Sequence, residues 1–235
     1  MKNNSIYELT LNHTGKMAGL SSVSTSPTKN PICQARQCVK GSICQNCFAA
    51  ATEKRYSNLG VKLARNYDKL TTRVFAESEI PVINTLMFRI EAFGDLVNDI
   101  QALNYLNLVK KNSAVNIAWW TKNPQFIKGA LKRLNIHSKA DFKAAYPNLT
   151  IVYSSMYMNE KSAIPGGCEW FIEKRFTVYS LDFLLNHSEI QINCGAASCR
   201  GCGLCYLKNN NVFDICELLK ADTKKAKKEG VNVND

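Results

Sequence analysis

Eight of the ten cysteines in this chain fall into two short groups, and these groups constrain its fold more than any other feature. The first quartet has the spacing C-x4-C-x5-C-x2-C and consists of Cys33, Cys38, Cys44 and Cys47. The second quartet has the spacing C-x4-C-x2-C-x2-C and consists of Cys194, Cys199, Cys202 and Cys205. The Gly, Ser and Asn residues between them favour loops, in which four thiolates can converge on one point. Because sulfur ligands in fours select iron–sulfur clusters or zinc, we expect both loops to bind metal.

The length and composition of the chain favour one domain spanning residues 1–235. A chain of 235 residues, 46% of them hydrophobic, can bury a large core without cross-links, and no Pro- or Gly-rich linker divides it. No apolar run has the length of a signal peptide or a membrane span, so we expect a cytoplasmic location and no membrane partner. Clustered cysteines in that reducing environment are typical of metal sites, although a disulfide framework stays open as an alternative.

A formal net charge of +11 indicates an anionic partner, such as nucleic acid. The basic excess is diffuse, however, and no basic motif interleaved with aromatic residues supports nucleic-acid binding. The lysine-rich run near the C-terminus predicts a basic, frayed helical tail over residues 220–235. Charge therefore leaves nucleic-acid binding open without favouring it.

Apolar segments that suit strands alternate with segments that suit helices. Strands are expected at residues 16–25, 86–93, 115–120, 149–154 and 176–180. Helices are expected at residues 97–111 and 124–134, and a helix pair interrupted at Gly60 follows the first quartet. This alternation predicts βαβ units and a parallel sheet. The expected fold class is therefore α/β: a partial or open (β/α) barrel with mostly parallel strands and two cysteine-rich metal-binding loops, 33–47 and 194–205.

The second quartet has the more specific spacing of the two. Its first three cysteines have the spacing of a plant-type ferredoxin loop, and its last three have that of a bacterial ferredoxin run. The small residues between them leave room for inorganic sulfide and let backbone N–H groups turn toward the sulfurs. Three cysteines at successive x2 intervals suit a cubic cluster better than a zinc ribbon, so we predict a [4Fe–4S] cluster, with zinc as the alternative metal.

The first quartet is less specific. Cys38, Cys44 and Cys47 form C-x5-C-x2-C, a spacing that could bind three irons of a second cluster and leave the fourth iron open. A structural zinc site, which would use all four thiolates and keep no open position, is the alternative.

Polar residues recur just after the expected strands, where parallel sheets and barrels form their ligand-binding face. Glu91 and Asp95 could bind a cofactor amine or act as acid and base, whereas Asp95 could instead cap the following helix. Lys122 could bind an anionic group of a ligand, or could be an ordinary exposed lysine.

Four residues outside these motifs also lead to expectations. Trp119 and Trp120 alternate across a strand, so one should pack in the core and the other should face the helices or a pocket, and core packing is the favoured prediction for both. Cys216 is expected on the buried apolar face of a helix, and Cys168, which follows two glycines on a loop, could be a spare ligand.

Six short motifs, in a fixed order and covering most of the chain, resemble the phage gene product eighty-eight family. They are GLSSVSTSPTKNPIC, CQNCFAA, FRIEAFGDL, AWWTKNP, IVYSSM and CRGCGLCY. That family is distantly similar to the radical S-adenosylmethionine barrel, which has a cysteine loop after its first strand and a glycine–acid motif at the end of its second. The resemblance implies a cluster on Cys38, Cys44 and Cys47. It also implies that Glu91, Gly94 and Asp95 lie at the place of the cofactor's amine.

The first quartet departs from the radical enzymes' C-x3-C-x2-C hallmark, in which an aromatic residue precedes the last cysteine. Here the middle gap is x5, Asn46 precedes Cys47, and Cys33 is a fourth thiol that could close the open iron. The family has no settled activity to transfer.

Three functions therefore stay open for a protein expected in the host cytosol. The first is a phage-type iron–sulfur protein with two [4Fe–4S] clusters that acts in redox chemistry or electron transfer with a redox partner. The second is a radical S-adenosylmethionine-like enzyme. The third is a metal-stabilised module that binds nucleic acid or a host protein.

Overall fold

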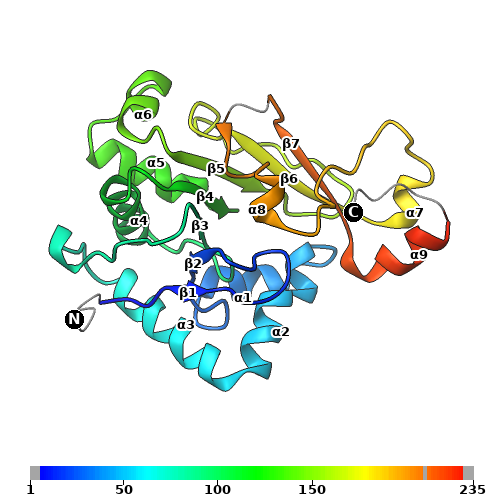
Figure 1. Cartoon of the computed structure of the whole chain (residues 1–235), viewed down its shortest axis with the longest axis horizontal. Helices are drawn as coiled ribbons and strands as arrows, with labels where there is room; N and C mark the ends of the chain where they lie inside the picture. Colours follow the sequence, from blue (N-terminus) through cyan, green and yellow to red (C-terminus); the bar gives the residue numbers. More distant parts are fainter. Residues whose placement is uncertain (1–5, 209–210, 230–235) are drawn as a thin grey trace.

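Seven strands form one open sheet in the computed structural model, which describes residues 6–208 and 211–229 (Figure 1). The strands are β1 (Thr10–Leu11), β2 (Ser21–Val23), β3 (Met87–Ile90), β4 (Asn116–Thr121), β5 (Leu149–Ser154), β6 (Lys174–Tyr179) and β7 (Asp214–Leu218). Their order in the sheet is their order in the sequence. Strand β1 pairs with β2 in the antiparallel direction, and all later neighbours pair in parallel. The expected α/β class with a mostly parallel, open sheet is confirmed.

Helices connect these strands. The α-helices are α1 (Pro31–Gln37), α2 (Phe48–Arg55), α3 (Ser57–Leu70), α4 (Asp99–Lys111), α5 (Pro124–Arg133), α6 (Lys139–Ala145), α7 (Leu181–Leu184), α8 (Cys199–Cys202) and α9 (Thr223–Lys228). Short 3₁₀ helices are η1 (Ile43–Asn46), η2 (Glu77–Glu79) and η4 (Lys220–Asp222). No helix in the described part of the chain is both long enough and apolar enough to cross a membrane.

Side-chain alternation along β3 and β4 separates the two faces of the sheet. Phe88, Ile90 and Trp119 are fully buried in the main core, together with apolar residues of α4 and α5. The Trp119 ring meets the Tyr105 ring of α4 edge-on, with 5.3 Å between centroids. Trp120 instead borders the cavity described below. The two rings lie on opposite faces of the strand as expected, but the prediction that both pack in the core is confirmed only for Trp119 and is wrong for Trp120, which is half-buried at the cavity.

The expected strands all form, but the first and the last strand of the sheet, β1 and β7, were not expected. Cys216 lies on β7, beside Thr177 of β6, so its assignment to a helix is wrong. The prediction that Cys216 is buried is confirmed, since only 6% of it is exposed. A segment of five residues that is rich in apolar side chains is compatible with a helix or a strand. Here the edge of β6 favours the strand, because it offers five consecutive backbone partners.

The expected helix pair also forms, but the break lies at another residue. Helices α2 and α3 are separated at Tyr56, whose backbone is extended (φ −117°, ψ 94°), and Gly60 lies inside α3. A Cβ atom on Gly60 would lie 3.4 Å from the Glu53 carbonyl oxygen. The glycine thus allows α3 to pack closely on α2 and does not interrupt it.

Residues near both ends of the sheet approach each other through the loop between β1 and β2. Lys16 on this loop forms an ion pair with Glu217 of β7, with 3.2 Å between Nζ and Oε1. Beyond β7, the basic tail continues as η4 and α9, and Ala226 of α9 is buried against Tyr179 and Leu181. Residues 230–235 of the expected frayed tail lie outside the described residues.

Candidate metal centre

A cavity of about 670 Å³ lies at the carboxyl ends of the parallel strands, within the size range of about 300–1,000 Å³ found for ligand sites. Three cysteines from each quartet line it: Cys33, Cys44, Cys47, Cys194, Cys199 and Cys205. The remaining two, Cys38 and Cys202, are exposed and are not among the lining residues. Two cysteine groups from opposite parts of the sequence therefore share one cavity.

The first quartet is positioned by caps at the starts of two short helices. The Asn30 side chain accepts hydrogen bonds from the backbone N–H groups of Ile32 and Cys33, at 2.9 and 3.3 Å, and so starts α1. The Ser42 hydroxyl accepts from the Cys44 N–H at 3.0 Å and starts η1. Neither α1 nor η1 has a buried residue, so these caps, rather than apolar packing, order the loop.

The second quartet is tied to both ends of the sheet. The Cys194 N–H donates to the carbonyl of Cys216 in β7 at 3.0 Å. The Cys199 N–H donates to the Lys16 carbonyl in the loop before β2 at 2.7 Å. After the single turn of α8, Gly203 adopts a left-handed conformation (φ +64°) that turns the chain toward Cys205.

Burial raises the pKa of four of the thiols that line this cavity. Burial raises the pKa of Cys33, and the nearby Asp95 and Glu91 carboxylates raise it further. Burial also raises the pKa of Cys194 and of Cys205 to about 12. The pKa of Cys199 is raised by burial as well, although the charges of Arg89 and Lys16 oppose that shift. Metal binding here must therefore release protons.

The donor set fits soft metal ions, because each quartet presents sulfur on a loop with small residues nearby. All ten cysteines are free. Within residues 6–208 and 211–229, no three Cys, His, Asp or Glu side chains converge closely enough to hold a single ion. The fold thus brings six of the eight predicted cysteine ligands to one cavity, but it does not arrange them around a single point.

Glu91 lies at the cavity wall, directly after β3, with only 3% of it exposed. Its carboxylate accepts hydrogen bonds from the Thr25 N–H and hydroxyl, the Gln101 amide and the Tyr105 hydroxyl, at 2.6–3.2 Å. Burial raises the pKa of Glu91 to about 8, although the hydrogen bonds from Tyr105 and Thr25 oppose this shift. Glu91 also has a left-handed backbone (φ +56°), which is costly for a residue with a Cβ atom.

Gly94 and Asp95 also line the cavity, as expected. Gly94 has φ +65°, and a Cβ atom there would collide with the Thr25 carbonyl oxygen. The Asp95 carboxylate accepts from the Thr121 hydroxyl at 2.6 Å and the Lys122 N–H at 2.9 Å. The alternative role of Asp95 as a helix cap is wrong, because α4 begins four residues later and is capped by Asn98.

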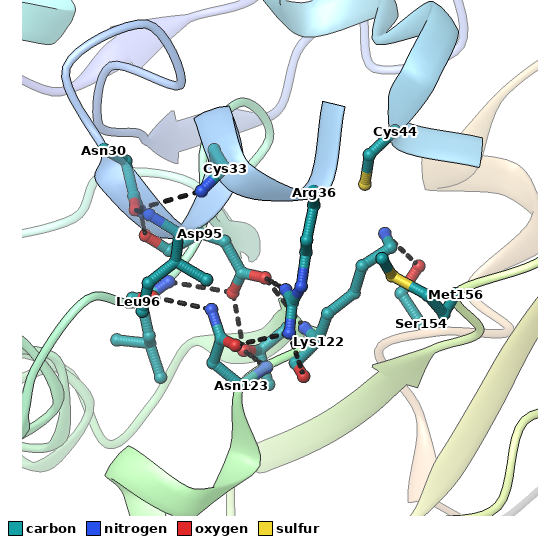
Figure 2. A network of polar contacts seen from close by, with 12 residues as sticks. Asn30, Cys33, Arg36, Cys44, Asp95, Leu96, Lys122, Asn123, Ser154 and Met156 are labelled. Atoms are coloured by element: carbon teal, nitrogen blue, oxygen red, sulfur yellow. Dashed lines mark hydrogen bonds and ion pairs between the residues drawn. The ribbon is translucent and has the colours of Figure 1, made fainter. Parts of the chain in front are cut away.

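Lys122 is the fourth expected ligand-binding residue that the fold brings to the cavity. Its ammonium group donates to the Ser154 hydroxyl at 2.9 Å, at the end of the neighbouring strand β5 (Figure 2). It forms no ion pair with a carboxylate among the described residues, so its charge is available to an anionic group in the cavity.

Arg36 was not expected at the site, yet it connects the first quartet to the strand ends (Figure 2). From α1 its guanidinium donates to Asp95 at 3.2 Å, to the Lys122 carbonyl at 3.1 Å and to the Asn123 side chain at 2.6 Å. Its place inside the first quartet was the only signal in the sequence, since its partners lie about 60 and 90 residues away.

Arg89 of β3 was also missed and borders the cavity beside the second quartet. Its guanidinium carbon lies 4.2 Å from the centroid of the Trp120 ring. The strand alternation that buries Phe88 and Ile90 could have identified Arg89 as a residue of the opposite face. Cys168 lies elsewhere: it is buried in the core among residues such as Phe171 and is not among the cavity-lining residues, so the spare-ligand prediction gains no support.

A scan against protein-family models found no match, and searches of curated proteins and of solved structures found none either. The resemblance to the phage gene product eighty-eight family thus remains a prediction from the motifs. The fold and the site together describe an α/β protein with a cavity at the strand ends that is lined by two cysteine quartets.

Proposed function

We propose that this chain is an iron–sulfur protein in which each quartet holds one [4Fe–4S] cluster beside the shared cavity, and that it acts in redox chemistry or electron transfer. The observation that carries this proposal is the meeting of three cysteines from each quartet at one cavity. A structural zinc site stabilises its own loop and requires no second site or shared cavity. Two redox groups, in contrast, exchange electrons only when they lie close together.

The charges around the cavity support an anionic resident group. Its lining contains five cationic and three acidic side chains: Lys16, Arg36, Arg89, Lys122, Lys220, Glu91, Asp95 and Glu217. Two of the carboxylates, on Asp95 and Glu217, are already paired with Arg36 and Lys16. The uncompensated positive charge suits a cluster held by thiolates, which is an anion. The sequential strand order likewise supports a partial (β/α) barrel whose mouth carries the clusters.

The test is a metal analysis of protein purified and reconstituted without oxygen. We expect a brown protein with about eight irons and eight sulfides per chain, four of each per cluster. The double variants Cys44→Ala/Cys47→Ala and Cys199→Ala/Cys205→Ala should each lose half of both. The Cys168→Ala variant is the matched control, because this cysteine is buried away from the cavity, and it should keep all of the iron. A colourless, zinc-loaded protein would end the proposal.

One observation favours a second candidate, an enzyme of radical S-adenosylmethionine type. Cys33, Cys44 and Cys47 line the cavity while Cys38 is exposed, so the three ligands of this candidate include Cys33 in place of Cys38, which the resemblance implies. Three ligands leave one iron open for a cofactor. Glu91, Gly94 and Asp95 line the same cavity. This candidate requires that dithionite-reduced protein cleave S-adenosylmethionine and that Cys38→Ala keep its first cluster. Absence of cleavage, together with a first cluster held by all four cysteines, would exclude it.

A further inference from the structure

Arg89 is a cation without a carboxylate partner at the wall of the cavity. No ion pair joins it to Asp or Glu in the described ranges 6–208 and 211–229, and its one hydrogen bond is a long contact from Nη1 to the Met17 sulfur at 3.8 Å. Its Nε atom is buried and has no acceptor. A buried N–H group without an acceptor costs free energy, so the Nε of this half-buried arginine indicates an anion that the protein atoms do not supply.

The direction of the Arg89 side chain is fixed by a row of aromatic rings on the cavity face. The guanidinium stacks on Trp120 of β4, and the Trp120 ring packs edge-on against Phe176 of β6 with 4.4 Å between centroids. Cation–π contact with tryptophan holds a guanidinium and leaves its outer N–H groups free to donate. The positive charge is therefore held at a defined place.

The groups that face this charge are those of the second quartet. Arg89 acts electrostatically on Cys199, Cys205 and the neighbouring Tyr206. Lys16 and Lys174 also act on these thiols, but each has a further partner: Lys16 pairs with Glu217, and the Lys174 ammonium donates to the Val212 carbonyl. At the first quartet the charges that act on Cys33 are those of Asp95 and Glu91, and Arg36 there pairs with Asp95.

We propose that Arg89 is the counter-charge of the second quartet, which stabilises its anionic metal-bound sulfurs and raises the reduction potential of that cluster alone. This inference rests on the proposed function. One-electron reduction from [4Fe–4S]²⁺ to [4Fe–4S]⁺ adds one negative charge and transfers no proton. A nearby cation stabilises the reduced form more than the oxidised form, and the potential rises as a result. Arg89 thus acts through charge and is not a ligand.

The test compares Arg89→Gln, which removes the charge, with Arg89→Lys, which keeps it. Both potentials are measured in the full chain by dithionite titration followed by electron paramagnetic resonance. The two signals are assigned with the quartet double variants. We expect R89Q to lower the equilibrium constant for reduction of the second cluster about tenfold, which is about 59 mV for a one-electron couple. R89K should keep the reduction potential of the second cluster close to the wild-type value. Neither variant should shift the potential of the first cluster.

Arg133→Met is the matched control, because Arg133 is an exposed arginine on α5, outside the cavity lining, and it should change neither potential. Loss of the second cluster in R89Q but not in R89K also supports the counter-charge, since charge separates the two variants. Unchanged potentials in R89Q, equal shifts of both clusters, or loss of the cluster in both variants would overturn it. Wild-type protein without iron overturns the proposed function as well, whereas bound iron with an unshifted potential overturns only the role of Arg89.

Discussion

Glu91 combines a left-handed backbone, near-complete burial and hydrogen bonds from four donor groups. Its contacts join the end of β2, through Thr25, to α4, through Gln101 and Tyr105. It therefore sets the spacing between the strand ends and the helix layer directly under the cavity.

We predict that Glu91→Gln changes how the stability of the protein depends on pH. The folded-state pKa of about 8 exceeds the usual 4.5, so the folded protein holds a proton that the unfolded chain releases between these values. The contribution of this proton to the free energy of unfolding is fully present below about pH 4.5. It decreases as the pH rises from there through 8, by no more than about 1.4 kcal/mol per pH unit. Urea unfolding of metal-free, reduced protein at several pH values measures this.

Relative to E91Q, the wild type should thus lose stability as the pH is raised from about 5 to about 8. The control is Glu77→Gln, a change at an exposed glutamate, which should follow the wild type throughout. Parallel curves for wild type and E91Q would contradict the prediction.

At the scale of elements, the first cysteine loop depends on polar contacts, because α1 buries none of its own residues. The Asn30 cap and the Arg36 contacts hold α1 against the ends of β3 and β4 (Figure 2). An element with so few apolar contacts opens locally at a low free-energy cost.

We therefore predict that Arg36→Met increases the opening of α1. Hydrogen bonds of charged groups contribute about 1.5 kcal/mol or more, so the alkylation rate of the Cys33 thiol in metal-free protein should rise about tenfold. Mass spectrometry after timed iodoacetamide treatment measures this rate. Arg65→Met, which removes a surface ion pair with Glu8, should leave it unchanged. An unaltered Cys33 rate in R36M would show that other contacts hold the helix.

Helices and strands with a clear pattern of apolar side chains could be predicted from the sequence. Those whose conformation depends on packing against a neighbouring element could not. The mostly apolar, fully buried run of β5 and the stripe of α4 form as expected, within about two residues. Strand β7 and the break at Tyr56 were missed, because pairing with β6 and packing of α2 on α3 choose between conformations that the local sequence leaves equal.

At the scale of the whole molecule, the loop before β2 connects the two ends of an open sheet. Lys16 donates to Glu217 of β7 and to the Cys194 carbonyl, at 3.2 and 3.3 Å. This places the second quartet against the first part of the chain and encloses the cavity. The sheet itself stays open, with β1 and β7 as its two edges, so this loop makes the contact between its two ends.

We predict that Lys16→Met lowers the free energy of unfolding by about 1 kcal/mol, or about 2–4 °C in Tm, because its ion pair is only partly exposed. Lys29→Met removes the more exposed pair with Asp68 and should cost less than about 0.5 kcal/mol. Urea unfolding and a double-mutant cycle with Glu217→Gln measure the coupling. Additive effects of K16M and E217Q would show that the pair does not connect the edges.

The sequence by itself determined the α/β class, the parallel strands and the two cysteine groups, because side-chain periodicity and ligand spacing are local properties of a chain. It also placed Glu91, Gly94, Asp95 and Lys122 at strand ends, and these four line the cavity as expected. Only the tertiary structure decided that both quartets meet there, that Cys38 and Cys202 are exposed outside the lining, and that Arg36 and Arg89 join the site. These contacts join residues about 60 to 200 positions apart, and packing of the whole sheet, rather than any local pattern, brings such groups together.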